Sequence, residues 1–297
     1  MSITDFFEKN KIKYLENEPL KKFSTFKIGG NADYILFPSD INEIISCIEA
    51  LSLNGVNYTV IGNGSNLLFS DDGFRGAVII TSQCRKIIVD GNILHALCGS
   101  SLSVLSNTAQ KKSLTGLEFA YGIPGTCGGA IYMNAGAYGS EISSVISRCT
   151  CYDVSNKKML TYEKNEMNLS YRHSVFMDNP NLIILSAVFS LNEGDGTKSL
   201  EIMQGNMKKR CASQPYSQPN AGSIFKKPEG HFAGKLIEDC GLKGYCVGGA
   251  MVSTKHAGFI VNNGDATADN VRELIEHIKE KVLSEYGVTL DCEIRFI

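Results

Sequence analysis

The stretch Ile123-Pro124-Gly125-Thr126-Cys127-Gly128-Gly129-Ala130-Ile131-Tyr132-Met133-Asn134-Ala135-Gly136-Ala137-Tyr138-Gly139 holds five glycines, one proline and no lysine or arginine. Because glycine costs roughly 1 kcal/mol per helical position relative to alanine, we expect neither an ordinary helix nor a central strand here. Such a segment lets a ligand approach the backbone closely. Without cations, it would bind an anion through backbone N–H groups. A nucleotide diphosphate fits this description, and a glycine-rich structural turn is the alternative.

A second glycine loop, Gly62-Asn63-Gly64-Ser65-Asn66, follows a predicted strand, as in a dinucleotide-binding fingerprint. Leu67 occupies the position of the third glycine, and the next residues are typical of a strand, so the Rossmann interpretation fails. The loop could still wrap a phosphate with N–H groups and small polar side chains. Two cation-free loops favour one dinucleotide held between two small lobes. A hydride-transfer cofactor bound outside a Rossmann fold is most often FAD.

Composition limits the class of protein. The chain has 297 residues, 43% hydrophobic and 20% charged, with a net charge of −2, which is ordinary for a globular protein of two or three domains. The charge argues against nucleic-acid binding. We expect neither a signal peptide nor a membrane span, and a cytoplasmic protein. The ten cysteines, scattered and without a C-x-x-C motif, predict reduced, mostly buried thiols and no metal site.

The pattern of apolar residues predicts a mixed α+β chain rather than a repeating βαβ array. Helices are predicted over 40–51, 102–112, 199–209 and 270–283. Strands are predicted over 57–61, 77–81, 148–154, 182–191 and 290–297, and a hairpin over 86–98 with a type I′ turn at Asp90-Gly91. Asp40 and Glu43 form a predicted capping box, Asp265 and Asp269 are predicted to cap the last helix, and residues 192–197 have the composition of a linker.

These loops and five later blocks resemble the UDP-N-acetylenolpyruvoylglucosamine reductase family. The later blocks, which follow in family order, are 171–174, 220–228, 234–238, 253–259 and 293–297. The resemblance implies a two-lobed FAD-binding domain of vanillyl-alcohol oxidase type, with lobes over 1–79 and 80–192, followed by a smaller α+β substrate-binding domain over 193–297. The interval between Arg172 and Ser223 is short. The chain therefore resembles the shorter subclass, which lacks an inserted loop with a tyrosine that closes over the UDP group.

In that family NADPH reduces FAD, and the flavin delivers hydride to the enolpyruvyl group of a UDP-amino sugar, which yields UDP-N-acetylmuramate for peptidoglycan synthesis. The resemblance implies Ser223 as proton donor, with Arg172 and Glu293 assisting at the carboxylate and the enolate. The chemistry agrees, because an enolate needs cations at its carboxylate and a proton donor at carbon. The fork of an arginine can bind both carboxylate oxygens. Glu293 is a candidate even without the resemblance, because an acidic residue in an apolar terminal strand usually forms an ion pair or has a catalytic role.

The resemblance assigns binding residues as well. The implied FAD contacts are Gly62, Asn63, Gly64, Ser65, Asn66, Tyr121, Gly122, Ile123, Pro124, Gly125, Gly128, Gly129, Ala130 and Asn134. The implied substrate contacts are Asn220, Lys226 and Arg295, of which the lysine can neutralise a diphosphate. Cys127 lies in the flavin loop, but we expect FAD to be bound non-covalently.

Two other functions stay open at this point. Another FAD oxidoreductase or oxidase of the same superfamily would share the two loops, but an oxidase needs a base for its alcohol rather than a proton donor. A non-catalytic nucleotide-binding module would be colourless and would need no acid at Glu293. The expected partners are a UDP-amino-sugar substrate and NADPH, with no nucleic acid and no membrane, and we expect a monomer.

Overall fold

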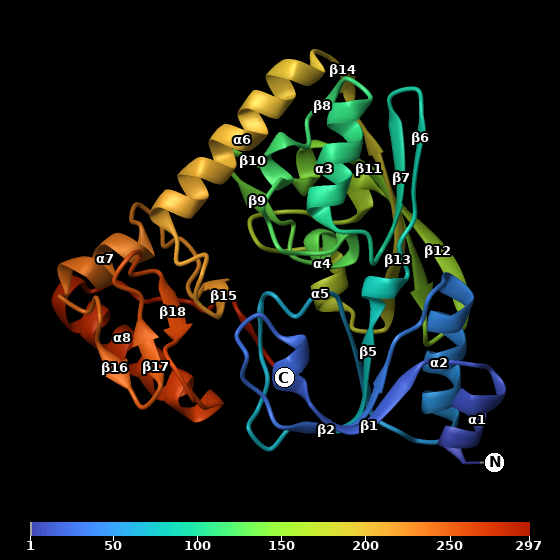
Figure 1. Cartoon of the computed structure of the whole chain (residues 1–297), viewed down its shortest axis with the longest axis horizontal. Coiled ribbons are helices and arrows are strands. Elements are labelled where there is room, and N and C mark those ends of the chain that lie inside the picture. The colour runs from blue at the N-terminus through green and yellow to red at the C-terminus, as the bar shows by residue number, and fades with distance from the viewer. Residues whose placement is uncertain (1) are drawn as a thin grey trace. The chain divides into compact units, whose positions relative to one another are not determined.

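The computed structural model describes residues 2–297 and divides the chain into two compact units (Figure 1). The first takes in the chain up to Leu15, then Tyr34–Asn63 and Gly76–Lys208, and the second takes in Glu16–Asp33, Gly64–Arg75 and Lys209–Ile297. Each unit has its own hydrophobic core. Because both units are discontinuous, a division by chain position at residues 79 and 192 does not describe them.

The main sheet of the first unit is antiparallel, with strand order β12-β11-β13-β7-β6. Its strands are β6 (Ile87–Asp90), β7 (Ile93–Leu97), β11 (Ile146–Asp153), β12 (Lys158–Glu163) and β13 (Leu182–Ser190). The core beside it contains the fully buried Phe7, Phe176 and Phe189. Burial of each such side chain stabilises the fold by roughly 1.5–3 kcal/mol.

Six helices belong wholly or mostly to this unit. They are α1 (Ile3–Lys9), α2 (Ile41–Leu53), α3 (Leu102–Lys111), α4 (Cys127–Tyr132), α5 (Val175–Asp178) and α6 (Gly196–Ser213).

The predicted cap of α2 is confirmed at Asp40, whose carboxylate accepts a hydrogen bond from the backbone N of Glu43. The other half of the predicted box is wrong, because Glu43 accepts from the backbone N of Ser39.

Smaller sheets and turns add to these elements. A four-stranded sheet has the order β1-β2-β5-β3, from β1 (Tyr14–Pro19), β2 (Asn31–Leu36), β5 (Phe74–Ile80) and β3 (Tyr58–Ile61). Two-stranded ladders join β8 (Leu114–Thr115) to β14 (Asn192–Glu193) and β9 (Gly136–Ala137) to β10 (Ser140–Glu141). The 3₁₀ turns are η1 (Leu20–Phe23), η2 (Thr81–Gln83), η3 (Glu118–Ala120), η4 (Ile142–Ser144) and η5 (Lys164–Glu166).

The predicted linker over 192–197 is wrong. Asn192–Glu193 is β14, which pairs with β8, and Gly196 begins the 18-residue α6. The carboxylate of Asp195 accepts hydrogen bonds from the backbone N of Thr197 (2.8 Å) and of Lys198 (3.4 Å). An aspartate in this position satisfies N–H groups that a helix start leaves open. The glycine- and aspartate-rich composition therefore marks the start of a helix.

The predicted hairpin over 86–98 is confirmed as β6 and β7, but its turn differs from the prediction. Asp90 pairs with Ile93, so the two loop residues are Gly91 and Asn92. Of these two, Gly91 alone has a left-handed φ, at +56°. A type I′ turn requires a positive φ at both central residues, so the type I′ prediction is wrong.

The second unit contains an antiparallel sheet of order β15-β18-β17-β16 and two helices. Its elements are β15 (Asn220–Ser223), α7 (Ala233–Asp239), β16 (Cys246–Val247), β17 (Ala250–Val252), β18 (Phe259–Asn262) and α8 (Ala268–Tyr286). The predicted apolar stripe of α8 is confirmed, since Val271, Leu274, Ile275, Ile278 and Val282 are all buried.

The caps of α8 differ from the prediction. Thr267 is the N-cap and forms a capping box with Asn270, whereas Asp265 lies outside the helix and Asp269 within its first turn. The helix ends at Gly287, whose φ of +66° suits a left-handed C-cap. The predicted closing strand is also shorter than expected: β19 (Arg295–Phe296) pairs in parallel with β4 (Leu67–Leu68), and Cys292 makes an isolated bridge with Phe225.

A carboxylate far away in the sequence also binds the start of α8. Asp71 accepts hydrogen bonds from the backbone N of Ala268 (2.9 Å) and of Asp269 (3.2 Å). We expect Asp71→Asn to lower the free energy of unfolding by about 1 kcal/mol, because it removes a charge that complements the helix dipole. Urea denaturation would measure this loss, with Asp72→Asn as a control that removes the neighbouring charge. Equal effects of the two variants would contradict the capping role.

The ten cysteines are free thiols, and six of them are buried, as predicted. Cys211 and Cys246 are exposed, which the prediction did not anticipate. Among residues 2–297, no helix combines the length and apolar character that a membrane span requires.

Candidate active site

Residues Gly62 and Asn63 of the 62–66 glycine loop meet the 123–139 glycine loop within the first unit. The side chain of Asn63 donates a hydrogen bond from Nδ2 to the backbone O of Pro124 at 3.1 Å. A Cβ atom on Gly62 would lie 2.3 Å from Oγ1 of Thr126, so only glycine fits there. The structure therefore brings together two segments, far apart in the sequence, that the sequence analysis assigns to one ligand.

Part of the 123–139 glycine loop is helical, contrary to the prediction that it forms no ordinary helix. Thr126 caps the short helix α4 by accepting a hydrogen bond from the backbone N of Gly129. The buried side of α4 packs against β13 and β7, and the backbone N of Gly128 donates to the backbone O of Cys98 at 2.8 Å. Tertiary packing thus compensates for the low helix propensity of the glycines.

The outer side of this loop is open. Gly129 is exposed, and a Cβ atom on it would meet only Oγ1 of Thr126, at 3.5 Å. A Cβ on Gly125 would likewise meet side chains no closer than 3.8 Å. These glycines are not required by packing within the protein, so they leave room for a ligand to reach the backbone.

The residues around these glycines, apart from Pro124, are buried or half-buried. Gly122 has a φ of +85°, and its backbone N donates to Oγ of Ser103 at 3.3 Å. Tyr121 and Ile123 are half-buried, Pro124 is exposed, and Ala130 is buried in α4.

Arg172 lies at the tip of a tight hairpin in the same unit. Ser170 and His173 exchange two backbone hydrogen bonds of 3.2 and 3.1 Å, which leaves Tyr171 and Arg172 as the two tip residues. Arg172 has a φ of +54°, and its guanidinium Nη2 donates to the backbone O of Gly136 at 3.3 Å. A left-handed arginine is strained, and such strain concentrates at functional sites. The structure thus brings Arg172 to the end of the glycine-rich stretch.

The second unit brings Ser223 and Glu293 together. The backbone N of Glu293 donates to the backbone O of Ile224, the residue after Ser223, at 2.7 Å. A register shift in β15 lies between Asn220 and Ser223, where Gly222 has a φ of +82°. Irregularities of this kind re-aim a side chain, and the hydroxyl of Ser223 donates to the backbone O of Phe225 at 3.1 Å. Both residues are half-buried.

The latter part of the 62–66 glycine loop, residues 64–66, lies beside Glu293 within the second unit. Nδ2 of Asn66 donates to the backbone O of Glu293 (3.2 Å), and the backbone N of Arg295 donates to the backbone O of Asn66 (2.9 Å). Gly64 has a φ of +62°, and a Cβ there would lie 2.4 Å from the backbone O of Phe23. Ser65 is half-buried.

The predicted substrate contacts have different surroundings. The Asn220 amide donates to the backbone O of Pro215 (3.2 Å) and of Gln218 (2.7 Å), so it shapes its own loop. The half-buried Lys226 donates its backbone N to the backbone O of Asp291, and Arg295 is exposed in β19. Lys226 follows Ser223 by three residues and Arg295 follows Glu293 by two, so both cations lie near these residues along the chain.

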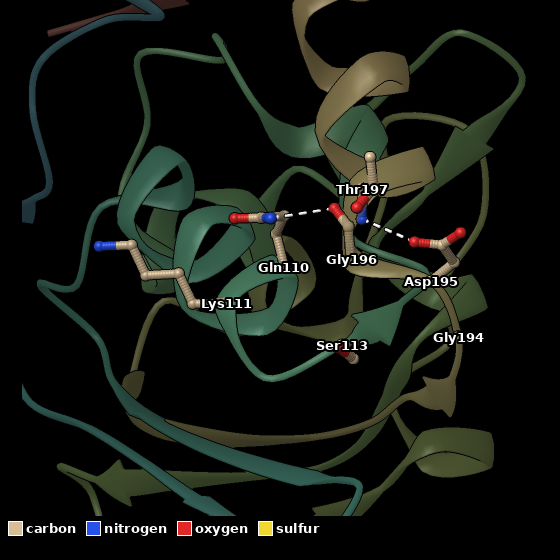
Figure 2. Close-up of a pocket in the computed structure, with 7 residues that line it drawn as sticks. All are labelled: Gln110, Lys111, Ser113, Gly194, Asp195, Gly196 and Thr197. Carbon is tan, nitrogen blue, oxygen red and sulfur yellow. Dashed lines mark hydrogen bonds between the residues drawn. The ribbon is translucent and has the colours of Figure 1, made fainter.

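A hollow in the first unit contains none of these residues (Figure 2). It lies where the end of α3 meets the start of α6, and Nε2 of Gln110 donates to the backbone O of Gly196 across it at 2.9 Å. Asp195 already binds the N–H groups at the start of α6. An anion would therefore meet a carboxylate there.

Comparison with known proteins gives the family. Residues 32–156 match the family described as FAD binding domain, and residues 214–297 match the UDP-N-acetylenolpyruvoylglucosamine reductase C-terminal domain. A UDP-N-acetylenolpyruvoylglucosamine reductase of Caldicellulosiruptor saccharolyticus is 47% identical over 294 residues, which cover 98% of this chain and 94% of the relative. One of Clostridium novyi is 43% identical over 99% of this chain and 95% of its own length. The chain belongs to the UDP-N-acetylenolpyruvoylglucosamine reductase family.

Solved structures agree with this family. The crystal structure of UDP-N-acetylenolpyruvylglucosamine reductase from Thermus caldophilus matches with a TM-score of 0.81 and 31% identity, over 96% of this chain and 98% of that one. A glucooligosaccharide oxidase from Acremonium strictum matches with a TM-score of 0.50 at 13% identity, over 98% of this chain and 60% of that one, and shows the fold alone. The predicted α+β class, with an FAD-binding domain of vanillyl-alcohol oxidase type and a smaller C-terminal domain, is confirmed.

The predicted site residues divide between the two matched regions. Both glycine loops lie in the FAD-binding match, and Ser223 and Glu293 lie in the C-terminal match. Arg172 lies between the two, where sequence similarity to either domain gives no guidance. The described residues between Arg172 and Ser223 form α5, β13, β14, α6 and the start of β15, as in the shorter subclass without an inserted loop.

Proposed function

We propose that this flavoenzyme reduces the enolpyruvyl group of UDP-N-acetylglucosamine enolpyruvate to UDP-N-acetylmuramate, with NADPH as reductant. The product is a peptidoglycan precursor, and we propose that the reaction takes place in the cytoplasm. The observation that carries this proposal is the hydrogen bond from the backbone N of Glu293 to the residue after Ser223. It joins the segment that carries Ser223 to the segment that carries Glu293, in the domain that is characteristic of the family.

The residues of the first unit fit FAD. The open glycines Gly125 and Gly129 would admit the diphosphate to the backbone, and neither glycine loop contains a cation to compete with N–H donors. FAD, when bound, supplies hydride after reduction by NADPH. Cys127 is fully buried, and burial raises the pKa of its thiol to about 12. A protonated, inaccessible thiol is a poor nucleophile, which supports a non-covalent flavin.

The chain's own residues then act on the substrate. Ser223 donates its hydroxyl proton to the carbon next to the carboxylate as hydride arrives at the terminal carbon. Arg172 binds the substrate carboxylate through two N–H groups and so stabilises the enolate charge. Glu293 assists at the enolate, and Lys226 and Arg295 neutralise the diphosphate of the UDP group.

The experiment is a visible absorption spectrum of the purified protein, recorded anaerobically before and after NADPH and then after the enolpyruvyl substrate. We expect a flavin spectrum that bleaches with NADPH and returns with the substrate. Acid precipitation should then release the flavin into the supernatant. A return of colour only with oxygen would indicate an oxidase of the same superfamily. A colourless protein that takes up no FAD would leave a nucleotide-binding module.

A further inference from the structure

The hairpin that carries Arg172 is attached to the glycine-rich stretch by three contacts. Oγ of the buried Ser174 donates to the backbone O of Tyr132 at 2.7 Å. Nη2 of Arg172 donates to the backbone O of Gly136 at 3.3 Å. Between these two, Nδ2 of Asn134 donates to the backbone O of Ser170 at 2.9 Å.

Asn134 is the centre of this attachment. Its side chain is fully buried and its φ is +41°, a conformation that asparagine tolerates better than most residues. Besides Ser170, its Nδ2 donates to Oε1 of Glu141 at 2.9 Å. Its Oδ1 accepts from the backbone N of Ser143 at 2.9 Å. Both N–H donors of the amide are therefore used within the protein.

The partners of Asn134 also fix which way its amide points. An ionised Glu141 can only accept hydrogen bonds, so it must face Nδ2, and the backbone N of Ser143 can only donate, so it must face Oδ1. Glu141 is itself held by Oγ of Ser143 at 2.6 Å. The bond to Ser170 thus comes from an amide that has one orientation, and it holds one side of the Arg172 hairpin.

We propose that Asn134 is a positioning residue for Arg172, and that its side chain does not bind FAD as the sequence analysis expected. This inference rests on the role of Arg172 in the proposed function. Arg172 has a long side chain and lies on a strained two-residue tip. The position of its guanidinium group therefore depends on the position of the hairpin that carries it. A shift of about 1 Å in a catalytic group can slow a reaction about 10²-fold.

The test uses Asn134→Gly in the full-length holoenzyme, because glycine keeps the left-handed backbone and removes only the amide. We expect an unchanged FAD content and an unchanged rate of flavin reduction by NADPH. Reoxidation of the reduced flavin by the enolpyruvyl substrate should slow by about 10²-fold, since that step alone needs Arg172. Asn168→Gly is the matched control, because Asn168 is an exposed asparagine with a φ of +47° close to the same hairpin.

A double-mutant cycle separates positioning from a general structural role. In an Arg172→Ala background, Asn134→Gly should cause no further slowing, because the group that it positions is gone. Glu141→Gln, which keeps an acceptor but loses the charge, should slow the same step less than Asn134→Gly does.

Four results would overturn the inference, each for its own reason. Loss of FAD from Asn134→Gly would restore the cofactor role of its amide. Additive slowing in the Arg172→Ala background, or equal slowing of both half-reactions, would reject the positioning role alone. Normal reoxidation in Arg172→Ala by itself would reject the proposed role of Arg172, and the inference with it.

Discussion

Replacement of Ser223 by alanine is expected to slow reoxidation of the reduced flavin by the enolpyruvyl substrate by about 10²- to 10⁴-fold, the usual contribution of a positioned proton donor. The reduction of FAD by NADPH should be unchanged, because that half-reaction needs no proton at the substrate carbon. Anaerobic stopped-flow absorbance of the flavin measures both half-reactions separately.

The geometry around Ser223 makes this variant a clean test. The hydroxyl of the half-buried Ser223 donates to the backbone O of Phe225, and the loss of one such hydrogen bond costs only about 1 kcal/mol, so alanine should not disturb the fold. Ser217→Ala, at an exposed serine in the preceding loop, is the control and should leave both half-reactions unchanged. Equal slowing of both half-reactions in Ser223→Ala would contradict its role as proton donor.

A bulky residue at Gly129 is expected to abolish flavin binding. We expect Gly129→Leu to weaken the affinity for FAD at least about 100-fold, which corresponds to about 2.7 kcal/mol. The physical reason is steric, because the leucine side chain would project from the exposed side of α4, where the proposed diphosphate approaches the backbone. Titration of the apoprotein with FAD, followed by flavin fluorescence, measures the loss.

The structure allows this loss to be separated from misfolding. A Cβ atom on Gly129 meets only Oγ1 of Thr126 at an ordinary distance of 3.5 Å, so the protein itself tolerates the side chain. Gly205 in α6 has no atom within 4 Å of an added Cβ, and Gly205→Leu therefore makes the same change on an open helix face. If Gly129→Leu stays yellow with an unaltered spectrum, the phosphate-loop interpretation is wrong.

The position of a left-handed or closely packed glycine could be anticipated from the sequence, but its neighbour could not. The composition of the two glycine loops, 62–66 and 123–139, predicted that another group approaches their backbone closely. Only the fold shows that, for Gly62, this neighbour is Thr126 of the other loop, whereas Gly129 is open. The conformational propensity of a glycine can be read from one residue, whereas its contact partner is known only from the positions of both residues.

The amino-acid sequence by itself determined the elements that a few neighbouring residues specify. The apolar stripe of α8, the cap of α2 at Asp40 and the hairpin of β6 and β7 follow from periodicity and turn chemistry within a few residues. The family blocks likewise indicated the site residues one by one. None of these patterns depends on contacts between segments that are distant in the sequence.

Tertiary structure alone decided the features that join distant segments. Glu193 pairs with Leu114, Arg295 pairs with Leu67, and Asp71 binds the start of α8. The amide of Asn134 likewise donates to the backbone O of Ser170, in the hairpin that carries Arg172. The residues joined by these contacts lie from dozens to more than two hundred positions apart in the sequence. The hydrogen bonds that satisfy each buried polar group are therefore known only when the whole chain has packed.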